Sequence, residues 1–110
     1  MTYDVDLAGR IRAVLRGQQG MTEKSMFGGL AFLVDGHMAV AAISHGGLMV
    51  RVDPAESASV LDEPHVRHFE MRGRQLDGWM QVAAEVIDED ADLRRWVTTG
   101  LAYARTLPPK

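Results

Sequence analysis

The 110-residue sequence contains no cysteine. This absence excludes disulfide bonds, thiol nucleophiles, zinc sites built on thiolates and cysteine-ligated iron–sulfur clusters. Aromatic residues are scarce, at 6%, and no apolar run approaches the roughly 20 residues that a membrane-spanning helix needs. The N-terminus carries Asp4 and Asp6 where a secretory signal carries basic residues. We therefore expect a cytoplasmic protein.

An excess of positive charge is also lacking. Twelve Lys and Arg residues stand against 15 Asp and Glu, which gives a net charge of −3 at pH 7. Because phosphate contacts need a concentrated positive face, direct nucleic-acid binding by this domain alone is not expected. Hydrophobic residues make up 46% of the chain and charged residues 25%, as in globular proteins. The length suits one core, so residues 1–110 are predicted to form a single domain.

The spacing of apolar residues and capping residues predicts three helices. An i, i+4, i+7, i+8 apolar stripe predicts a helix over residues 4–18, with Asp4 as its N-cap. Asp53 and Pro54 predict a second helix that runs to about residue 62, because Asp caps a helix and Pro fits its first position. A run of acids predicts that a third helix begins near Asp88 or Asp90 and ends before Pro108.

Short apolar runs between turn residues predict the strands. They cover residues 22–27, 30–34, 37–43, 48–53, 65–71 and 78–83. Asp35 and Gly36 separate two apolar runs, which is a strong hairpin signal because both turn positions favour a positive φ. The early strands follow one another through tight turns, so the sheet should be antiparallel. The predicted class is α+β, with four to six strands and helices at the N-terminus, in the middle and at the C-terminus.

The residue types that carry catalysis or bind metals lack the spacing that those functions require. No serine lies in a G-x-S-x-G motif, and Ser44 and His45 are neighbours that would point to opposite faces of a strand. The four histidines lack the spacing of a metal site, and helix capping explains the acids from Asp88 to Asp92. We therefore predict no catalytic residues, no metal and no cofactor.

Three other features allow a structural and a functional interpretation. Gly28 and Gly29 do not match a phosphate-binding loop, so a bend between two strands is favoured. Most of the seven methionines are expected to face the helices and fill core gaps, and the alternative is a methionine-lined binding groove. The arginines around Arg67, Arg72 and Arg74 favour a solvated turn, and the alternative is an anion-binding patch.

Several segments together resemble one known family. The quoted residues are Lys24-Ser25-Met26-Phe27-Gly28-Gly29-Leu30-Ala31-Phe32, Asp35-Gly36, Leu48-Met49-Val50-Arg51-Val52, Gly78-Trp79-Met80, and Trp96 with Leu101-Ala102-Tyr103-Ala104-Arg105. They resemble the N-terminal domain of the TfoX/Sxy family, and the resemblance spans about residues 4–107.

The resemblance implies a fold and a class of function. The fold would be α+β and similar to the secretion-chaperone-like group, in which homodimers are common. Named members regulate bacterial competence together with the cyclic-AMP receptor protein, are not known as enzymes, and carry a second domain of helix-hairpin-helix type. Because this chain ends at Lys110, we expect a single-domain member that lacks the second domain.

These observations together predict a non-enzymatic regulatory or protein-interaction domain. Its expected partner is another protein or a second copy of the same chain. The expected binding residues are Met26, Phe27, Gly28 and Gly29, with Trp79 as their neighbour, because a large side chain facing outward beside two glycines would mark a partner surface. A small-molecule-binding module with an apolar pocket between sheet and helix is the alternative. An enzyme whose site is assembled from distant residues is a third interpretation.

Overall fold

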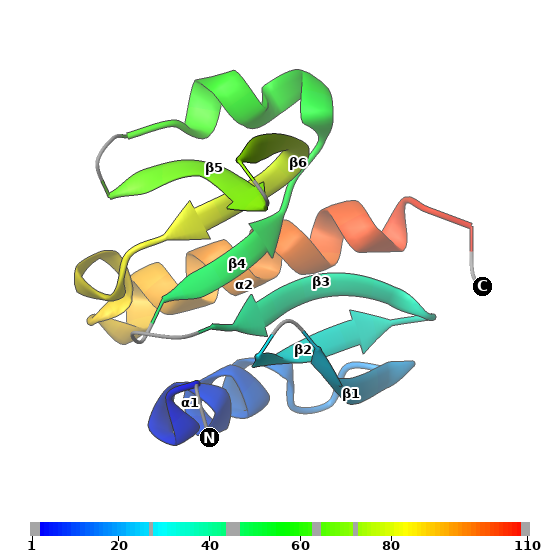
Figure 1. The fold of residues 1–110 in the computed structure, drawn as a ribbon. Helices are drawn as coiled ribbons and strands as arrows, with labels where there is room; N and C mark the ends of the chain where they lie inside the picture. Colours follow the sequence, from blue (N-terminus) through cyan, green and yellow to red (C-terminus); the bar gives the residue numbers. More distant parts are fainter. Residues whose placement is uncertain (1–2, 27, 44–46, 63–64, 72, 109–110) are drawn as a thin grey trace.

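A computed structural model describes residues 3–26, 28–43, 47–62, 65–71 and 73–108. It confirms the α+β class and the antiparallel sheet, with six strands (Figure 1). In chain order the elements are α1 (Val5–Leu15), β1 (Met21–Met26), β2 (Gly29–Val34), β3 (His37–Ala42), β4 (Leu48–Arg51), η1 (Pro54–Val60), β5 (Val66–Met71), β6 (Arg74–Val82), η2 (Ala84–Ile87) and α2 (Asp90–Arg105). None of the helices within these described residues is long and apolar enough to cross a membrane.

The strands lie in the order β1-β2-β3-β4-β6-β5, and every neighbouring pair is antiparallel. The predicted hairpin between β2 and β3 is confirmed, because Asp35 and Gly36 adopt φ values of 51° and 87°. Only β4 and β6 are sheet neighbours that do not follow one another along the chain. The segment between them contributes η1 and the edge strand β5.

The predicted middle helix is a 3₁₀ helix, η1, and not an α-helix. Its start is as expected, because the Asp53 carboxylate accepts a hydrogen bond from the Ala55 N–H at 2.9 Å. The hydroxyl groups of Ser57 and Ser59 donate to the carbonyl oxygens three residues before them, at 3.0 and 2.7 Å. Short polar side chains that bond to the nearby backbone compete with regular helix formation. A single short, tight helix is the result.

The largest departures from the predicted boundaries are at the end of α1 and at the start of β6. Helix α1 has the predicted N-cap, since Asp4 accepts from the N–H groups of Asp6 and Leu7, but it ends at Leu15, earlier than expected. Strand β6 begins at Arg74 and is longer than predicted. In β6 a bulge around Gly78 interrupts the pairing with β5, and such a break hides a continuous strand from pattern reading.

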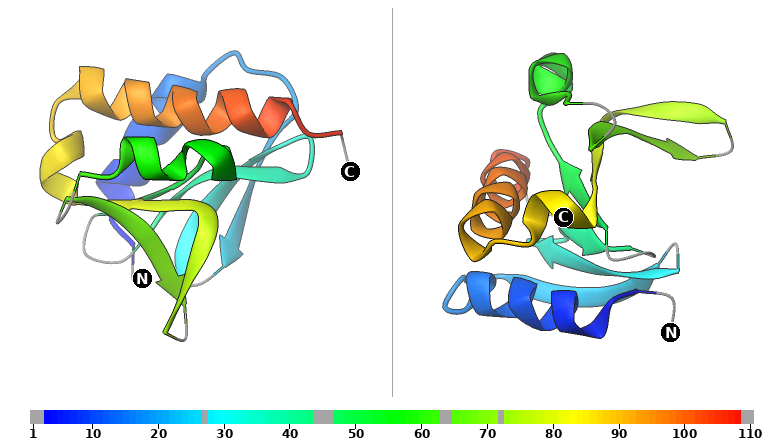
Figure 2. Two further views of the ribbon diagram at one scale, coloured as in Figure 1. Left: turned by 90° about the horizontal axis from the view of Figure 1, so that it is seen from above. Right: turned by 90° about the vertical axis from the view of Figure 1, so that its left-hand side faces the viewer.

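The sheet curls strongly, and both α-helices pack on its outer face (Figure 2). Strand residues that point outward, such as Phe32, Val40 and Val50, belong to one apolar core with Ile11 of α1 and Val97 of α2. The outer core continues around the curl to Val66 of β5. Because successive side chains of a strand point to opposite faces of the sheet, the side chains between these outward-pointing residues point to the inner face.

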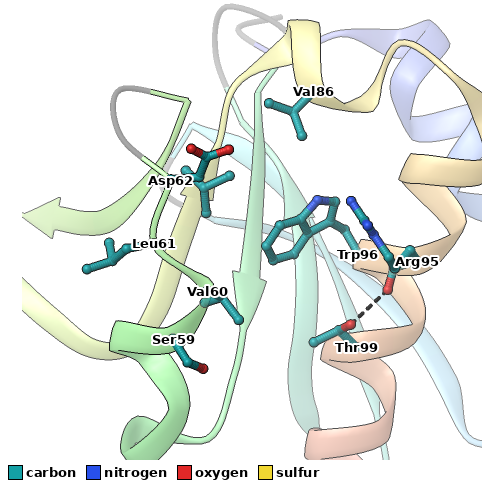
Figure 3. A pocket seen from close by; sticks show the side chains of 9 residues that line it. Ser59, Val60, Leu61, Asp62, Val86, Arg95, Trp96 and Thr99 are labelled. Carbon is teal, nitrogen blue, oxygen red and sulfur yellow. Dashed lines mark hydrogen bonds between the residues drawn. The ribbon is translucent and has the colours of Figure 1, made fainter.

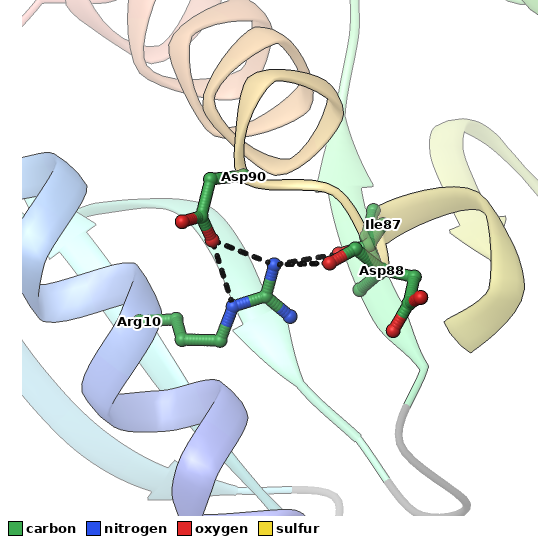
Figure 4. A network of polar contacts seen from close by, with 4 residues as sticks. All are labelled: Arg10, Ile87, Asp88 and Asp90. Atoms are coloured by element: carbon green, nitrogen blue, oxygen red, sulfur yellow. Dashed lines mark hydrogen bonds and ion pairs between the residues drawn. The ribbon is translucent and has the colours of Figure 1, made fainter.

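Arg10 joins α1 to the segment that leads into α2 (Figure 4). Its guanidinium donates to the carbonyl oxygens of Ile87 and Asp88, at 2.8 and 3.1 Å, and to the Asp90 carboxylate at 3.0 Å. The Asp90 side chain is 94% exposed, so that ion pair is weak. The two backbone contacts satisfy carbonyl groups at the end of η2 and thereby position the start of α2.

Helix α2 approaches β3 closely at Gly100. A Cβ atom at this position would overlap the Ala39 carbonyl oxygen and lie 2.9 Å from a methyl carbon of Val40. Gly9 in α1 is the opposite case, because a Cβ there would meet no atom within 4 Å. Of these two helical glycines, only Gly100 is required by the packing.

We expect Gly100→Ala to lower the free energy of unfolding by about 1–3 kcal/mol, because the helix must move away from β3. Gly9→Ala is the matched control. It should raise the free energy of unfolding by up to about 1 kcal/mol, because alanine favours the helix and no atom obstructs the added methyl group. Urea denaturation followed by circular dichroism measures both. Equal effects of the two substitutions would contradict the close approach of α2.

Arg12 of α1 and Glu23 of β1 form a bidentate ion pair, with nitrogen–oxygen distances of 2.7 and 2.8 Å. The hydrogen bond from Arg12 lowers the pKa of Glu23 below its ordinary value of 4.5. A carboxylate with a lowered pKa in the folded state stabilises the fold above its unfolded pKa, and this contribution is lost as the pH falls.

We therefore expect wild type to be more stable than Glu23→Gln at pH 7, with the difference fading as the pH falls below about 4.5. In an Arg12→Gln background the same substitution should have no pH-dependent effect of this kind. Thermal melts of the four proteins between neutral and acidic pH provide the measurement. If wild type stays more stable than Glu23→Gln at low pH, the ion pair is not the source of the difference in stability.

Candidate functional site

The inner face of the sheet carries a second apolar cluster, and all of it comes from the strands or from the residue that follows β3. Its buried members are Ala31, Met38, Ala41, Ile43 and Met49, and Met26, Leu33, Phe69 and Trp79 are partly buried around them. We call this set the inner sheet face. The sheet's own curl brings the β1–β2 and β5–β6 hairpins toward the same side, as the right-hand view of Figure 2 shows. This curl, and not a helix, covers the cluster.

The structure brings two of the predicted binding residues together. Met26 of β1 and Trp79 of β6 both pack against the inner sheet face, although 53 positions separate them in the sequence. Gly28 has a φ of 73°, and a Cβ atom on Gly29 would overlap the Ala42 carbonyl oxygen. Gly28 thus supplies a positive φ between β1 and β2, and Gly29 lets the start of β2 lie close to the end of β3. Phe27 lies outside the described residues.

The expectation that most methionines face the helices was wrong. Met80 belongs to the outer core, but Met26, Met38 and Met49 pack on the inner sheet face. A one-residue offset of register reverses the face of a strand side chain, and the bulge between Phe32 and Leu33 produces such an offset next to Met38. Methionine is flexible and polarizable, which suits a surface that adapts to a partner.

Strand register places three cations on the same face. Lys24 pairs with Ala31 and Arg51 pairs with Trp79, and both partners belong to the inner sheet face. Arg67 pairs with Gln81, which also pairs with Met49 of that face. Within the described part of the chain, none of the three cations takes part in an ion pair. The neighbouring acid Glu23 points to the outer face, where it binds Arg12. The inner sheet face is therefore apolar with a basic edge.

Arg51 is held between two aromatic rings. Its guanidinium carbon lies 4.8 Å from the ring centroid of Trp79 and 5.8 Å from that of Tyr103 on α2. Both distances are within the range of a cation–π interaction. One ring belongs to the inner sheet face and the other to α2, so these contacts hold the guanidinium at the boundary between the two.

A separate hollow lies on the outer side of the molecule, between α2 and the segment from η1 to the start of β5 (Figure 3). We call it the η1–α2 groove. Its volume is about 410 Å³, within the range of small-molecule sites. Its apolar lining comes from Val60, Leu61, Val66, Val86 and Trp96, and its polar lining comes from Ser59, Asp62, Arg95 and Thr99. It adjoins a smaller hollow at Val60 and Thr99.

Trp96, one of the residues that line this groove, carries an unsatisfied donor. The residue is only 8% exposed, and its indole nitrogen has no hydrogen-bond partner among the described residues. An unpaired buried donor costs about 1–3 kcal/mol, so it calls for an explanation. From the sequence, Trp96 was noted as one of the residues that carry the family resemblance. Its spacing in α2 gave no sign that the indole N–H would lack an acceptor.

The residues Met26, Gly28, Gly29 and Trp79 lie in a part of the chain that matches a known family. The sequence profile of the TfoX N-terminal domain matches residues 13–104. Neither curated proteins nor solved structures gave a significant match. The match covers most of the 110 residues and supports a regulator-like domain at the level of the family. This chain belongs to the TfoX N-terminal domain family.

Proposed function

We propose that this chain is a non-enzymatic regulatory domain that binds a protein segment on the inner sheet face. The observation that supports this proposal is the apolar cluster around Met49 and Trp79, which no helix covers in the described chain and which three unpaired cations border. Its partly buried members offer contact area, and Lys24, Arg51 and Arg67 offer charge.

The chemistry of the face selects the kind of partner. Apolar side chains of a partner would contact Met26, Phe69 and Trp79, while acidic side chains would pair with the cations at the edge. A protein segment that mixes Leu, Ile or aromatic residues with Asp and Glu meets both requirements. Charge complementarity of this kind favours the correct partner and accelerates encounter.

Two other occupants fit less well. A second copy of the chain docked through the same face would bring its own Lys24, Arg51 and Arg67 against those of the first, and like charges oppose such contact. A nucleic acid would need more phosphate contacts than three cations supply, on a chain whose net charge is −3. The homodimer expected from the resemblance would thus use another surface.

The proposal is tested by selecting peptides from a random display library on the folded protein at low salt. We expect the selected peptides to combine acidic residues with large apolar residues. Their affinity should fall at least about tenfold in the double variant Lys24→Glu/Arg67→Glu, because two attractive charges become repulsive. Isothermal titration calorimetry measures the affinities.

Arg16→Glu/Arg94→Glu is the matched control, because both arginines are exposed on the helical side and the change in net charge is the same. This variant should keep the affinity of the wild type. The proposal fails if the selected peptides lack acidic residues, or if both double variants lose affinity equally.

A further inference from the structure

We infer that the η1–α2 groove is a binding site for a small monocarboxylate with an apolar body. The carboxylate would accept hydrogen bonds from the Trp96 indole N–H and the Arg95 guanidinium, and the apolar body would lie along Val60, Leu61 and Val66. This inference does not depend on the inner sheet face, which lies on the other side of the sheet.

The indole N–H of Trp96 requires an acceptor. The nitrogen is buried and has no partner in the described part of the chain, and it belongs to a side chain that lines the groove. An indole nitrogen can only donate a hydrogen bond, so a cation or a second donor cannot satisfy it. The nitrogen is closed off from solvent, and Figure 3 shows half-buried Val86 on that side. The carboxylate would reach the nitrogen when Val86 turns aside.

Arg95 supplies the positive charge that makes an anionic acceptor preferable to a neutral one. Its guanidinium carbon lies 6.0 Å from the Trp96 ring centroid, and Figure 3 shows the two groups on the same side of the groove. Its contact with Asp92 is a single 3.5 Å ion pair between exposed side chains, which is weak enough to be given up. Arginine matches the geometry of a carboxylate well.

The remainder of the groove selects a ligand with only one charged end. Away from Arg95 the wall is formed by valine and leucine side chains with the uncharged Ser59 and Thr99, and Asp62 stands on the η1 side. The adjoining hollow is lined by Asp53 and Glu56, which would repel a second carboxylate. An aliphatic or aromatic monocarboxylate therefore fits, whereas a dicarboxylate does not.

The two tryptophans allow a direct test, because a ¹⁵N-labelled sample gives one indole N–H signal for each. The Trp79→Phe variant assigns them. The probes are octanoate, octan-1-ol and suberate, each titrated to roughly 5 mM so that a millimolar Kd is detected. We expect octanoate to shift the Trp96 signal saturably and to leave the Trp79 signal in place. Octan-1-ol and suberate should bind at least about tenfold more weakly.

Arg95→Gln should raise the Kd for octanoate about tenfold, because a charge-assisted hydrogen bond is lost. Arg94→Gln is the matched control, since Arg94 is the neighbouring exposed arginine and borders a different hollow near Arg10. It should leave the Kd unchanged. Both positions are exposed on α2, so circular dichroism should show intact folds.

Four results would overturn the inference. They are the lack of a saturable Trp96 shift, equal affinity for octanoate and octan-1-ol, equal effects of Arg95→Gln and Arg94→Gln, and a shift of the Trp79 signal alone. The last result would place octanoate on the inner sheet face.

Discussion

The structure depends on how a curled sheet with apolar side chains on both faces is covered by only two α-helices. Both helices pack on the outer face, where α2 can lie close to β3 because Gly100 has no side chain. Apolar surface left in water is costly, at roughly 25 cal/mol per Å². The inner face must therefore be covered by the sheet itself. The sheet curls so that the β1–β2 and β5–β6 hairpins both bend toward the inner side.

The outer face is covered by helices and the inner face by the curl of the sheet, and this difference accounts for the composition of the inner sheet face. Self-coverage by a curved sheet leaves its edges partly open, and Met26, Phe69 and Trp79 occupy those edges. The Arg51 guanidinium is held there by its contacts with the rings of Trp79 and Tyr103. A face closed by a helix would have buried the same residues fully and left no surface for a partner.

The η1–α2 groove has a related origin. The segment between β4 and β5 forms a short 3₁₀ helix that packs over β6, so it does not cover α2 as a longer helix would. Trp96 fills part of the space that remains, but its nitrogen finds no acceptor there. The two candidate sites thus lie on opposite sides of the sheet and use different side chains.

Local sequence patterns determined the class, the positions of α1, η1 and α2, the Asp4 and Asp53 caps, and the Asp35-Gly36 hairpin, because each depends on residues close together in the chain. They also indicated Met26 and Trp79 through their motifs. They did not indicate η2. Which face each methionine occupies, the length of β6 and the isolation of the Trp96 nitrogen were decided by the tertiary structure. Bulges reset strand register, and a hydrogen-bond acceptor can come from any part of the fold, so neither can be read from neighbouring residues.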